Sequence, residues 1–282
     1  AAVAMSGREG GSTRDEEQLL IQLKLFASYS PAEVVLRYLD DPRPSPPEHP
    51  EQEDFEAAIG FVDVSGFTAL SEKLNKDHGR KGAELLNQYI NAYFKELIDG
   101  VFLHHGDVIK FAGDAMQVVW RNRRGATETL AQLILRASVC CLDLLKRLNN
   151  FSPVEGVVLK LHMGVGAGIL SSFYVGGFQG KWEYFVAGEP IEQMSDATEE
   201  ATHGQLVLST TAYKIMQAAE EVTSHKAMIG DVLESTQFLL TDLMDINTDP
   251  SARRLSTSQF SNPFRRVNTS ALHLSQPSSG AN

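Results

Sequence analysis

The run Ala58–Thr68, AIGFVDVSGFT, decides the fold of this chain and indicates its chemistry. It begins with apolar and β-branched residues, which predict a buried strand. Asp63 lies at the end of that strand, where an apolar run rarely carries a charge. Ser65–Thr68 then breaks the strand pattern and leads into a helical pattern. N–H groups at a helix start favour phosphate, and a carboxylate can hold the accompanying Mg²⁺. The run therefore predicts either a metal–phosphate site or an ordinary turn with Asp63 as a cap.

A second run, His105–Trp120, predicts two short strands joined by the tight turn Gly113-Asp114. A hairpin beside the first strand would bring the Asp114 carboxylate up to Asp63. Two acids that converge on one site repel each other unless cations hold them, so the pair predicts a divalent metal site. Asp107 is the competing ligand, and we expect it to serve the turn that precedes its strand.

Together, FVDVSGFT at 61–68 and KFAGDA at 110–115 resemble the class III nucleotide cyclases, and more closely the first catalytic half of the soluble, bicarbonate-responsive adenylyl cyclases. The resemblance covers roughly residues 55–240. It implies an α+β domain with a ferredoxin-like, palm-type β-α-β-β-α-β core, to which the strand and helix counts also conform. By resemblance alone, it further implies a cilium or flagellum as one possible location.

The resemblance also implies a reaction, in which the ribose 3′-hydroxyl of ATP attacks the α-phosphate to give cAMP and pyrophosphate leaves. It implies two Mg²⁺ ions, for which Mn²⁺ can substitute, held by Asp63 and Asp114 with the Val64 carbonyl completing one coordination shell. The β- and γ-phosphates would be bound by the backbone amides of Ser65, Gly66, Phe67 and Thr68.

The residues that read the base and stabilise the transition state in this family are not matched. With Gly188 taken as the glycine that ends the relevant strand, Phe185 stands at the base-reading position. Glu192 then stands where an Asn orients the ribose, and Asp196 where an Arg meets developing negative charge. An aromatic side chain cannot recognise adenine through a hydrogen bond to a carboxylate. An Asp has the same sign as the negative charge that develops in the transition state, and so opposes it. Half of the catalytic set is therefore missing.

No arginine occurs between Arg147 and Arg253, so no neighbour replaces the missing cation. We therefore expect this chain to be nearly inactive alone and to need a second cyclase-like domain, in the same or another chain. Lys110 would belong to the second pocket of the pair, where the soluble cyclases bind bicarbonate with this Lys and an Arg. Ser195 stands at the Arg position, so bicarbonate activation is not expected. The alternative is a non-catalytic cyclase-homology module that binds a partner, or nucleotide without turnover.

Composition predicts the organisation of the rest of the chain. Residues 1–14 are polar and Gly-rich and are expected to be disordered. Helical spacing predicts a helical extension over 15–40, made of two short helices. They could pack on the domain or bind a partner, and packing is the interpretation we favour. Residues 41–54 carry five prolines among acids, which is typical of a linker, and the cyclase-like domain follows over 55–240. Residues 241–282 are expected to be a disordered tail, in which Arg253-Arg254-Leu255-Ser256 resembles a site for a cAMP-dependent kinase, although a solvated basic tail is the interpretation we favour.

Charge and cysteine content exclude several classes of protein. The net charge of −11 argues against nucleic acid as a partner. No apolar run approaches the ~20 residues that span a bilayer, and Cys140 and Cys141 are adjacent in a helical pattern, which excludes a disulfide framework. A cytoplasmic chain is expected. His162, in an apolar strand, is expected to be a core residue, and Gly164, Gly166 and Gly168 predict a strand face free for close backbone approach.

Overall fold

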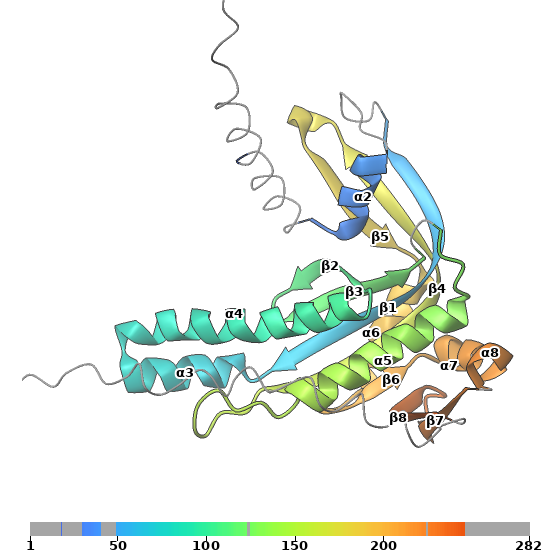
Figure 1. Ribbon diagram of the computed structural model, residues 1–282. Coiled ribbons are helices and arrows are strands. Elements are labelled where there is room, and N and C mark those ends of the chain that lie inside the picture. The colour runs from blue at the N-terminus through green and yellow to red at the C-terminus, as the bar shows by residue number, and fades with distance from the viewer. Residues whose placement is uncertain (1–17, 19–29, 41–48, 123–124, 224, 246–282) are drawn as a thin grey trace, which may run out of the picture. The chain divides into compact units, whose positions relative to one another are not determined.

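The structure is a computed structural model that describes residues 18, 30–40, 49–122, 125–223 and 225–245. Helices and strands are interspersed along the described part of the chain (Figure 1). In chain order they are α2 (Ala32–Asp40), β1 (Glu51–Ser65), α3 (Phe67–His78), α4 (Arg80–Leu103), β2 (Asp107–Ala112), β3 (Ala115–Arg121), α5 (Leu130–Leu148), β4 (Lys160–Gly176), the 3₁₀-helix η1 (Phe178–Gly180), β5 (Trp182–Ala187), α6 (Glu189–Glu200), β6 (Leu206–Leu208), α7 (Thr210–Ala218), α8 (Glu220–Thr223), β7 (Lys226–Val232) and β8 (Phe238–Asp245).

The described strands form one sheet in the order β2-β3-β1-β4-β6-β8-β7, and β5 pairs with β4 outside this path. β1 is antiparallel to both β3 and β4, and β2 is antiparallel to β3. The order β2-β3-β1-β4, with helices between β1 and β2 and between β3 and β4, is that of a ferredoxin-like core. The predicted α+β fold class is confirmed.

The pairing of β1 with β4 is unbroken from Glu51 to Ser65, and it shows which β1 residues lie on each face of the sheet. Side chains alternate along such a strand, so every second residue from Glu51 through Phe55 and Ile59 lies on the same face as Asp63. We call this the Asp63 face. The other face carries fully buried side chains such as Ala58 and Val62, and α5 and α7 pack against these strands.

Helix α6 packs on the Asp63 face over the glycines of β4. A Cβ atom on Gly164 would lie 2.3 Å from the Thr198 amide nitrogen, and one on Gly166 would lie 2.3 Å from the Pro190 carbonyl oxygen. Only glycine permits this approach, so the prediction of a strand face open to close backbone contact is confirmed. Met194 of α6 completes a buried apolar cluster with β1 residues such as Ile59.

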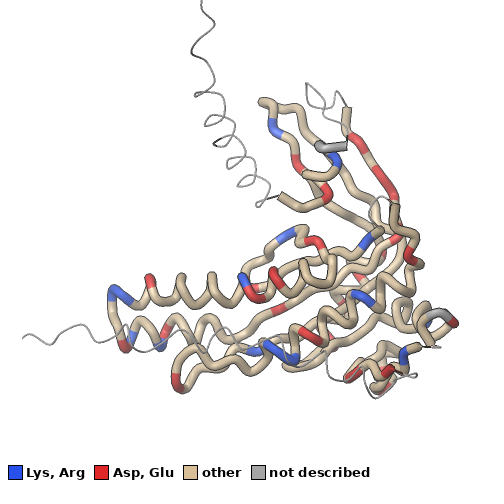
Figure 2. The backbone as a smooth tube through the Cα atoms, viewed as in Figure 1, with Lys and Arg blue, Asp and Glu red and all other residues tan. Residues whose placement is uncertain are grey.

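Beyond α6, the sheet continues into an extension that we call the arm. It consists of Glu51–Phe55 of β1, Leu170–Gly176 of β4 and Trp182–Ala187 of β5, paired side by side. Figure 1 shows helix α2 beside the arm, and Figure 2 shows acidic residues gathered along the start of β1. The predicted packing of this N-terminal helix on the domain is confirmed for α2.

Several element boundaries differ from the prediction. β1 begins at Glu51 inside the predicted linker, because its acids occupy an arm strand whose side chains are largely exposed. α4 continues to Leu103, close to the start of the hairpin, because the apolar residues Val101–Leu103 extend its helical pattern. β7 and β8 were not predicted, and β8 ends at Asp245, beyond the predicted domain end.

The predicted first helix of the extension, the N-terminal segment 1–14 and the Arg253–Ser256 motif lie outside the described residues. Within the described residues, none of the helices combines the length and apolar character that crossing a bilayer requires.

Candidate active site

The structure places the two predicted metal-binding acids at neighbouring positions of the sheet. Asp63 lies near the end of β1, where its register partner in β3 is Ala115. Asp114 is the residue before Ala115, in the two-residue turn between Ala112 and Ala115 that joins β2 and β3. The hairpin expected from Gly113-Asp114 is thus formed beside the first strand. Asp114 is exposed in this turn, so its carboxylate is accessible.

The segment Ser65–Thr68 makes the predicted passage from strand to helix. α3 begins at Phe67, and Gly66 precedes it with φ +112°, a conformation that favours glycine. A Cβ atom at Gly66 would also lie 2.7 Å from the Val158 carbonyl oxygen. No side chain among the described residues caps α3, which rules out the alternative of Asp63 as a helix cap. The first N–H groups of α3 remain without a side-chain acceptor, as a phosphate site requires.

His162 is a site residue that the sequence analysis missed. It faces Asp63 across the β1–β4 pair, and its Nε2 atom lies 3.2 Å from the Asp63 Oδ2 atom. Its Nδ1 atom is buried without a hydrogen-bond partner among the described residues, and its ring lies edge-on to that of His203. The expectation of an ordinary core histidine is wrong, because the side chain is 17% exposed and contacts the carboxylate.

The donor set fits a hard divalent cation. Among the described residues, no group of three or more His, Cys, Asp or Glu side chains is placed to hold a metal. Two carboxylates, Asp63 and Asp114, and the backbone carbonyl of Val64 are oxygen donors, the ligand type that Mg²⁺ prefers. Mg²⁺ commonly binds proteins through one or two carboxylates and completes its shell with water and substrate phosphates, so these residues suffice only together with a nucleotide.

Asp107 was expected to serve the preceding turn, and the structure contradicts this expectation. Its carboxylate accepts hydrogen bonds from the backbone N–H groups of Ala32 and Glu33, at 2.8 and 3.0 Å, and so caps the start of α2. The two partners are 75 and 74 residues away in the chain, and no local pattern predicts such a contact. Asp107 is therefore engaged in holding α2 on the hairpin.

The residues that replace the expected base-reading and transition-state groups lie on β5 and α6. Gly188 does separate β5 from α6, as assumed. Phe185 stacks on Phe173 with 5.2 Å between ring centroids. The three α6 residues at the expected functional positions are all exposed, namely Glu192, Ser195 and Asp196.

Lys110, the lysine expected in the second pocket, is also exposed. Lys110 lies in β2 and pairs with Gln117 of β3.

Comparison with known proteins shows the family to which the chain is similar. Residues 50–236 match the family model "Adenylate and Guanylate cyclase catalytic domain". Adenylate cyclase type 10 of Homo sapiens is 28% identical over 170 residues, which cover 60% of this chain and 10% of that protein. The chain thus matches about a tenth of the length of that relative.

Solved structures of cyclase domains share the fold. The adenylyl cyclase CyaB from P. aeruginosa has a TM-score of 0.52 at 17% identity, covering 71% of this chain and 98% of that one. The dimeric guanylyl cyclase domain of the RhoGC fusion protein from the aquatic fungus Blastocladiella emersonii has a TM-score of 0.53 at 16% identity, covering 69% and 98%. Since the family model matches well over half of the sequence, this chain belongs to the adenylate and guanylate cyclase catalytic domain family.

Proposed function

We propose that this chain is the metal-binding half of an adenylyl cyclase, which converts ATP to cAMP and pyrophosphate only when a complementary cyclase-like domain completes the site. The observation that carries the proposal is the juxtaposition of Asp63, the Asp114 turn and the uncapped start of α3. A structural module gains nothing from placing two acids together, because like charges disfavour each other.

Each of these groups has a distinct role in the proposed reaction. Asp63 and Asp114, with the Val64 carbonyl, would hold two Mg²⁺ ions, or Mn²⁺ in their place. The bound metal supplies activation of the 3′-oxygen and neutralisation of the triphosphate. The amides of Ser65–Thr68 would orient the β- and γ-phosphates at the positive end of α3. His162 would keep the Asp63 carboxylate in position.

The dependence on a second domain follows from what α6 lacks. Glu192 and Asp196 add negative charge where a cation is needed, and no arginine lies between Arg147 and Arg253. The complementary domain must therefore bring the residues that read adenine, orient the ribose and stabilise the transition state. Lys110 would contribute to the second, non-catalytic pocket of such a pair.

A second candidate function is a non-catalytic cyclase-homology module that binds a partner. The exposed Glu192, Ser195 and Asp196 favour it, because none of them has the chemistry of its family position. It differs from the main proposal in one measurable respect, since a pure binding module has no reason to bind a divalent metal at Asp63. We predict a cytoplasmic location for both candidate functions.

The test is nucleotide turnover with Mg²⁺ or Mn²⁺, using ATP and GTP separately. The chain is assayed alone and after addition of the second catalytic half of a soluble adenylyl cyclase. We expect no product from the chain alone and cAMP from the mixture. Asp63→Ala should abolish the activity of the mixture, whereas Asp77→Ala, which removes an exposed acid on α3, should leave it unchanged.

Three outcomes separate the alternatives. Formation of cGMP from GTP in place of cAMP would replace the adenylyl assignment by a guanylyl one. Turnover by the chain alone would contradict the need for a second half. If the mixture forms no cyclic nucleotide and the chain shows no metal-dependent nucleotide binding, the non-catalytic module would be favoured.

A further inference from the structure

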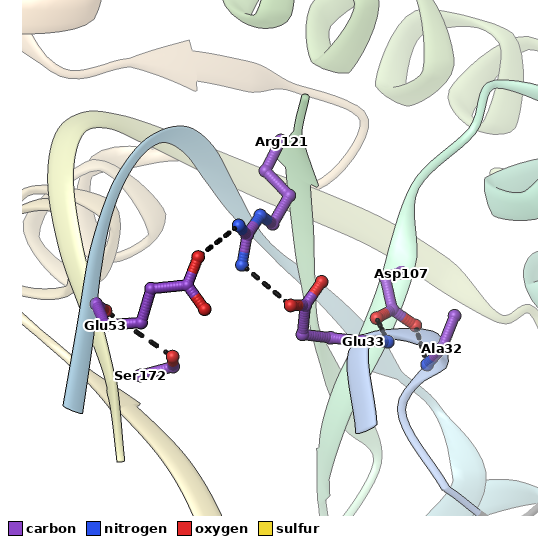
Figure 3. A network of polar contacts seen from close by, with 6 residues as sticks. All are labelled: Ala32, Glu33, Glu53, Asp107, Arg121 and Ser172. Carbon is purple, nitrogen blue, oxygen red and sulfur yellow. Dashed lines mark hydrogen bonds and ion pairs between the residues drawn. The ribbon is translucent and has the colours of Figure 1, made fainter. Parts of the chain in front are cut away.

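Helix α2 is held on the domain by a small network of charged groups (Figure 3). The Asp107 carboxylate of β2 accepts the N–H groups of Ala32 and Glu33 at its start. The Glu33 side chain forms an ion pair with Arg121 of β3 at 3.0 Å, and Arg121 also bonds to Glu53 of β1 at 3.1 Å. One helix start is thus tied to three strands.

A second contact lies one helical turn further along α2. Arg37, four residues after Glu33 and so on the same helix face, stacks over the ring of Tyr174 with 4.2 Å to its centroid. Arg37 also pairs with Glu51 at the start of β1. Both partners belong to the arm, so α2 bridges the β2–β3 hairpin and the arm.

The docking is shallow. Within Ala32–Arg37, the part of α2 whose burial the structure describes, no residue is fully buried, and Leu36 is exposed. A helix of nine residues does not persist in water by itself, so α2 depends on these contacts for its helical state. The ion pairs of α2, Arg37–Glu51 and Glu33–Arg121, leave 18–28% of their side-chain surface exposed, so water and salt screen them in part. α2 is therefore suited to leave the domain without unfolding it.

The position of α2 matters because it lies on the Asp63 face. Its partners on β1, Glu51 and Glu53, are an even number of residues from Asp63 along an unbroken strand. Their side chains therefore lie on the same face as that of Asp63. Arg121 pairs with Ala57 of the same set. A domain that completes the site from outside must approach this face, since Asp63 lies on it.

The surface beneath α2 has the composition of a protein interface. Tyr174 and Tyr184 lie 5.0 Å apart at their ring centroids, and Arg121 stacks on Phe55. Tyr and Arg are enriched in the energetically important centres of interfaces. The Tyr174 hydroxyl is buried without a hydrogen-bond partner among the described residues, and burial raises the pKa of Tyr174 to about 12. A docked partner could supply the missing hydrogen bond.

We propose that α2 is an autoinhibitory helix, which covers the aromatic surface of the arm on the Asp63 face and must leave before a complementary cyclase-like domain can dock there. The inference rests on the proposed function, since it names the second half of that site as the occupant that α2 excludes. Release of α2 controls pairing of the two halves and not the chemistry at Asp63.

The test uses full-length variants that weaken the docking contacts. Arg37→Glu places like charge against Glu51, and Glu51→Arg in the same chain restores the pair with reversed polarity. Asp107→Ala removes the acceptor for the start of α2. Lys95→Glu, which disrupts an exposed ion pair with Asp99 on α4, is the matched control. Thermal unfolding verifies that each variant remains folded.

Two quantities are measured for each variant. Hydrogen–deuterium exchange of the α2 amides reports release of the helix. Sedimentation velocity with the second catalytic half of a soluble adenylyl cyclase, and with the chain alone, reports association. We expect Arg37→Glu and Asp107→Ala to raise exchange in α2 and to tighten association with the second half about tenfold. The charge-reversed pair should return both values toward wild type, and Lys95→Glu should change neither.

The opposite results overturn the inference. Unchanged exchange in the Arg37→Glu/Asp107→Ala double variant would mean that α2 is a fixed part of the domain. Faster exchange with equal or weaker association, or with no association at all, would mean that α2 does not exclude the partner.

The two proposals fail separately. Tighter association upon release, but no cAMP from the mixture, would retain the autoinhibitory helix and reject the cyclase function. Activity of the wild-type mixture that release does not raise would retain the function and reject the autoinhibitory helix.

Discussion

The Nε2 atom of His162 lies 3.2 Å from the Oδ2 atom of Asp63, and the two residues are direct register partners in β4 and β1. This contact places an imidazole nitrogen beside the carboxylate on which the proposed metal site depends. Groups that orient a metal ligand in this way are commonly worth about 10–100-fold in metal affinity. His162 is therefore expected to act on the metal through Asp63.

We predict that His162→Ala weakens Mn²⁺ binding about tenfold, because the Asp63 carboxylate loses its orienting partner. His162→Gln, whose amide N–H can still donate, should recover part of the affinity. Isothermal titration with Mn²⁺ and a non-hydrolysable ATP analogue measures both. His203→Ala is the control, since it removes only the ring beside His162. Tighter metal binding by His162→Ala would show instead that the imidazole competes with the cation.

Binding of metal and nucleotide should stabilise the folded chain. A ligand that binds only the native state adds about 2.7 kcal/mol at one hundred times its Kd, so the unfolding temperature should rise in the presence of Mn²⁺ and the ATP analogue. Asp63→Asn and Asp114→Asn should lose the rise, because each removes one of the two carboxylates. Differential scanning fluorimetry measures it, and Asp77→Asn should behave as wild type. A rise that persists in both site variants would place the metal elsewhere.

The strand-to-helix passage should tolerate no side chain at Gly66. Its φ of +112° and the 2.7 Å separation of an added Cβ atom from the Val158 carbonyl oxygen act together in Gly66→Ala. We expect a loss of about 2 kcal/mol or more in the free energy of unfolding, measured by urea titration. Gly125→Ala is the matched comparison, because φ is +82° there but nothing lies within 4 Å. Equal losses in the two variants would argue against the close contact at Gly66.

The sequence predicted those parts of the site that are encoded locally. Ala58–Thr68 carries its own strand, turn and helix start, and Gly113-Asp114 carries its own hairpin, so the expected placement of Asp63 beside the Asp114 turn is confirmed. The role of these two acids as metal ligands stays a prediction. The β4 glycines Gly164 and Gly166 likewise indicated a close backbone approach before α6 was known to supply it.

The remaining features depend on register and on distant contacts. Whether His162 faces Asp63 depends on how β4 pairs with β1, and a shift of one residue would turn its side chain to the other face. The bond between Asp107 and α2 joins segments 75 residues apart. The acids of Glu51–Asp54 resembled a linker because an arm strand with exposed side chains carries no apolar alternation.

The two cysteines should be unreactive in the folded chain. Cys140 and Cys141 are fully buried in α5, and burial raises the pKa of both thiols, that of Cys141 to about 12. The thiolate is the reactive form, so labelling by a disulfide reagent at neutral pH should be negligible. Two equivalents should react once the chain is unfolded in guanidinium. Rapid labelling of either thiol under native conditions would contradict the burial of α5.

The decrease in the free energy of unfolding at acidic pH should depend on Asp143. The His104 imidazole and the Arg147 guanidinium hold the pKa of Asp143 below its usual value of 3.8, against the opposing effect of burial. A depressed carboxyl pKa contributes stability above the unfolded pKa, and this contribution is lost as pH falls through the lower, folded value. Asp143→Asn should therefore be less stable than wild type near neutral pH, and the difference should shrink steadily below about pH 4. Urea unfolding across this range measures it, with Asp77→Asn on α3 as an exposed comparison. A difference that stays constant with pH would show that Asp143 acts through packing and not through its charge.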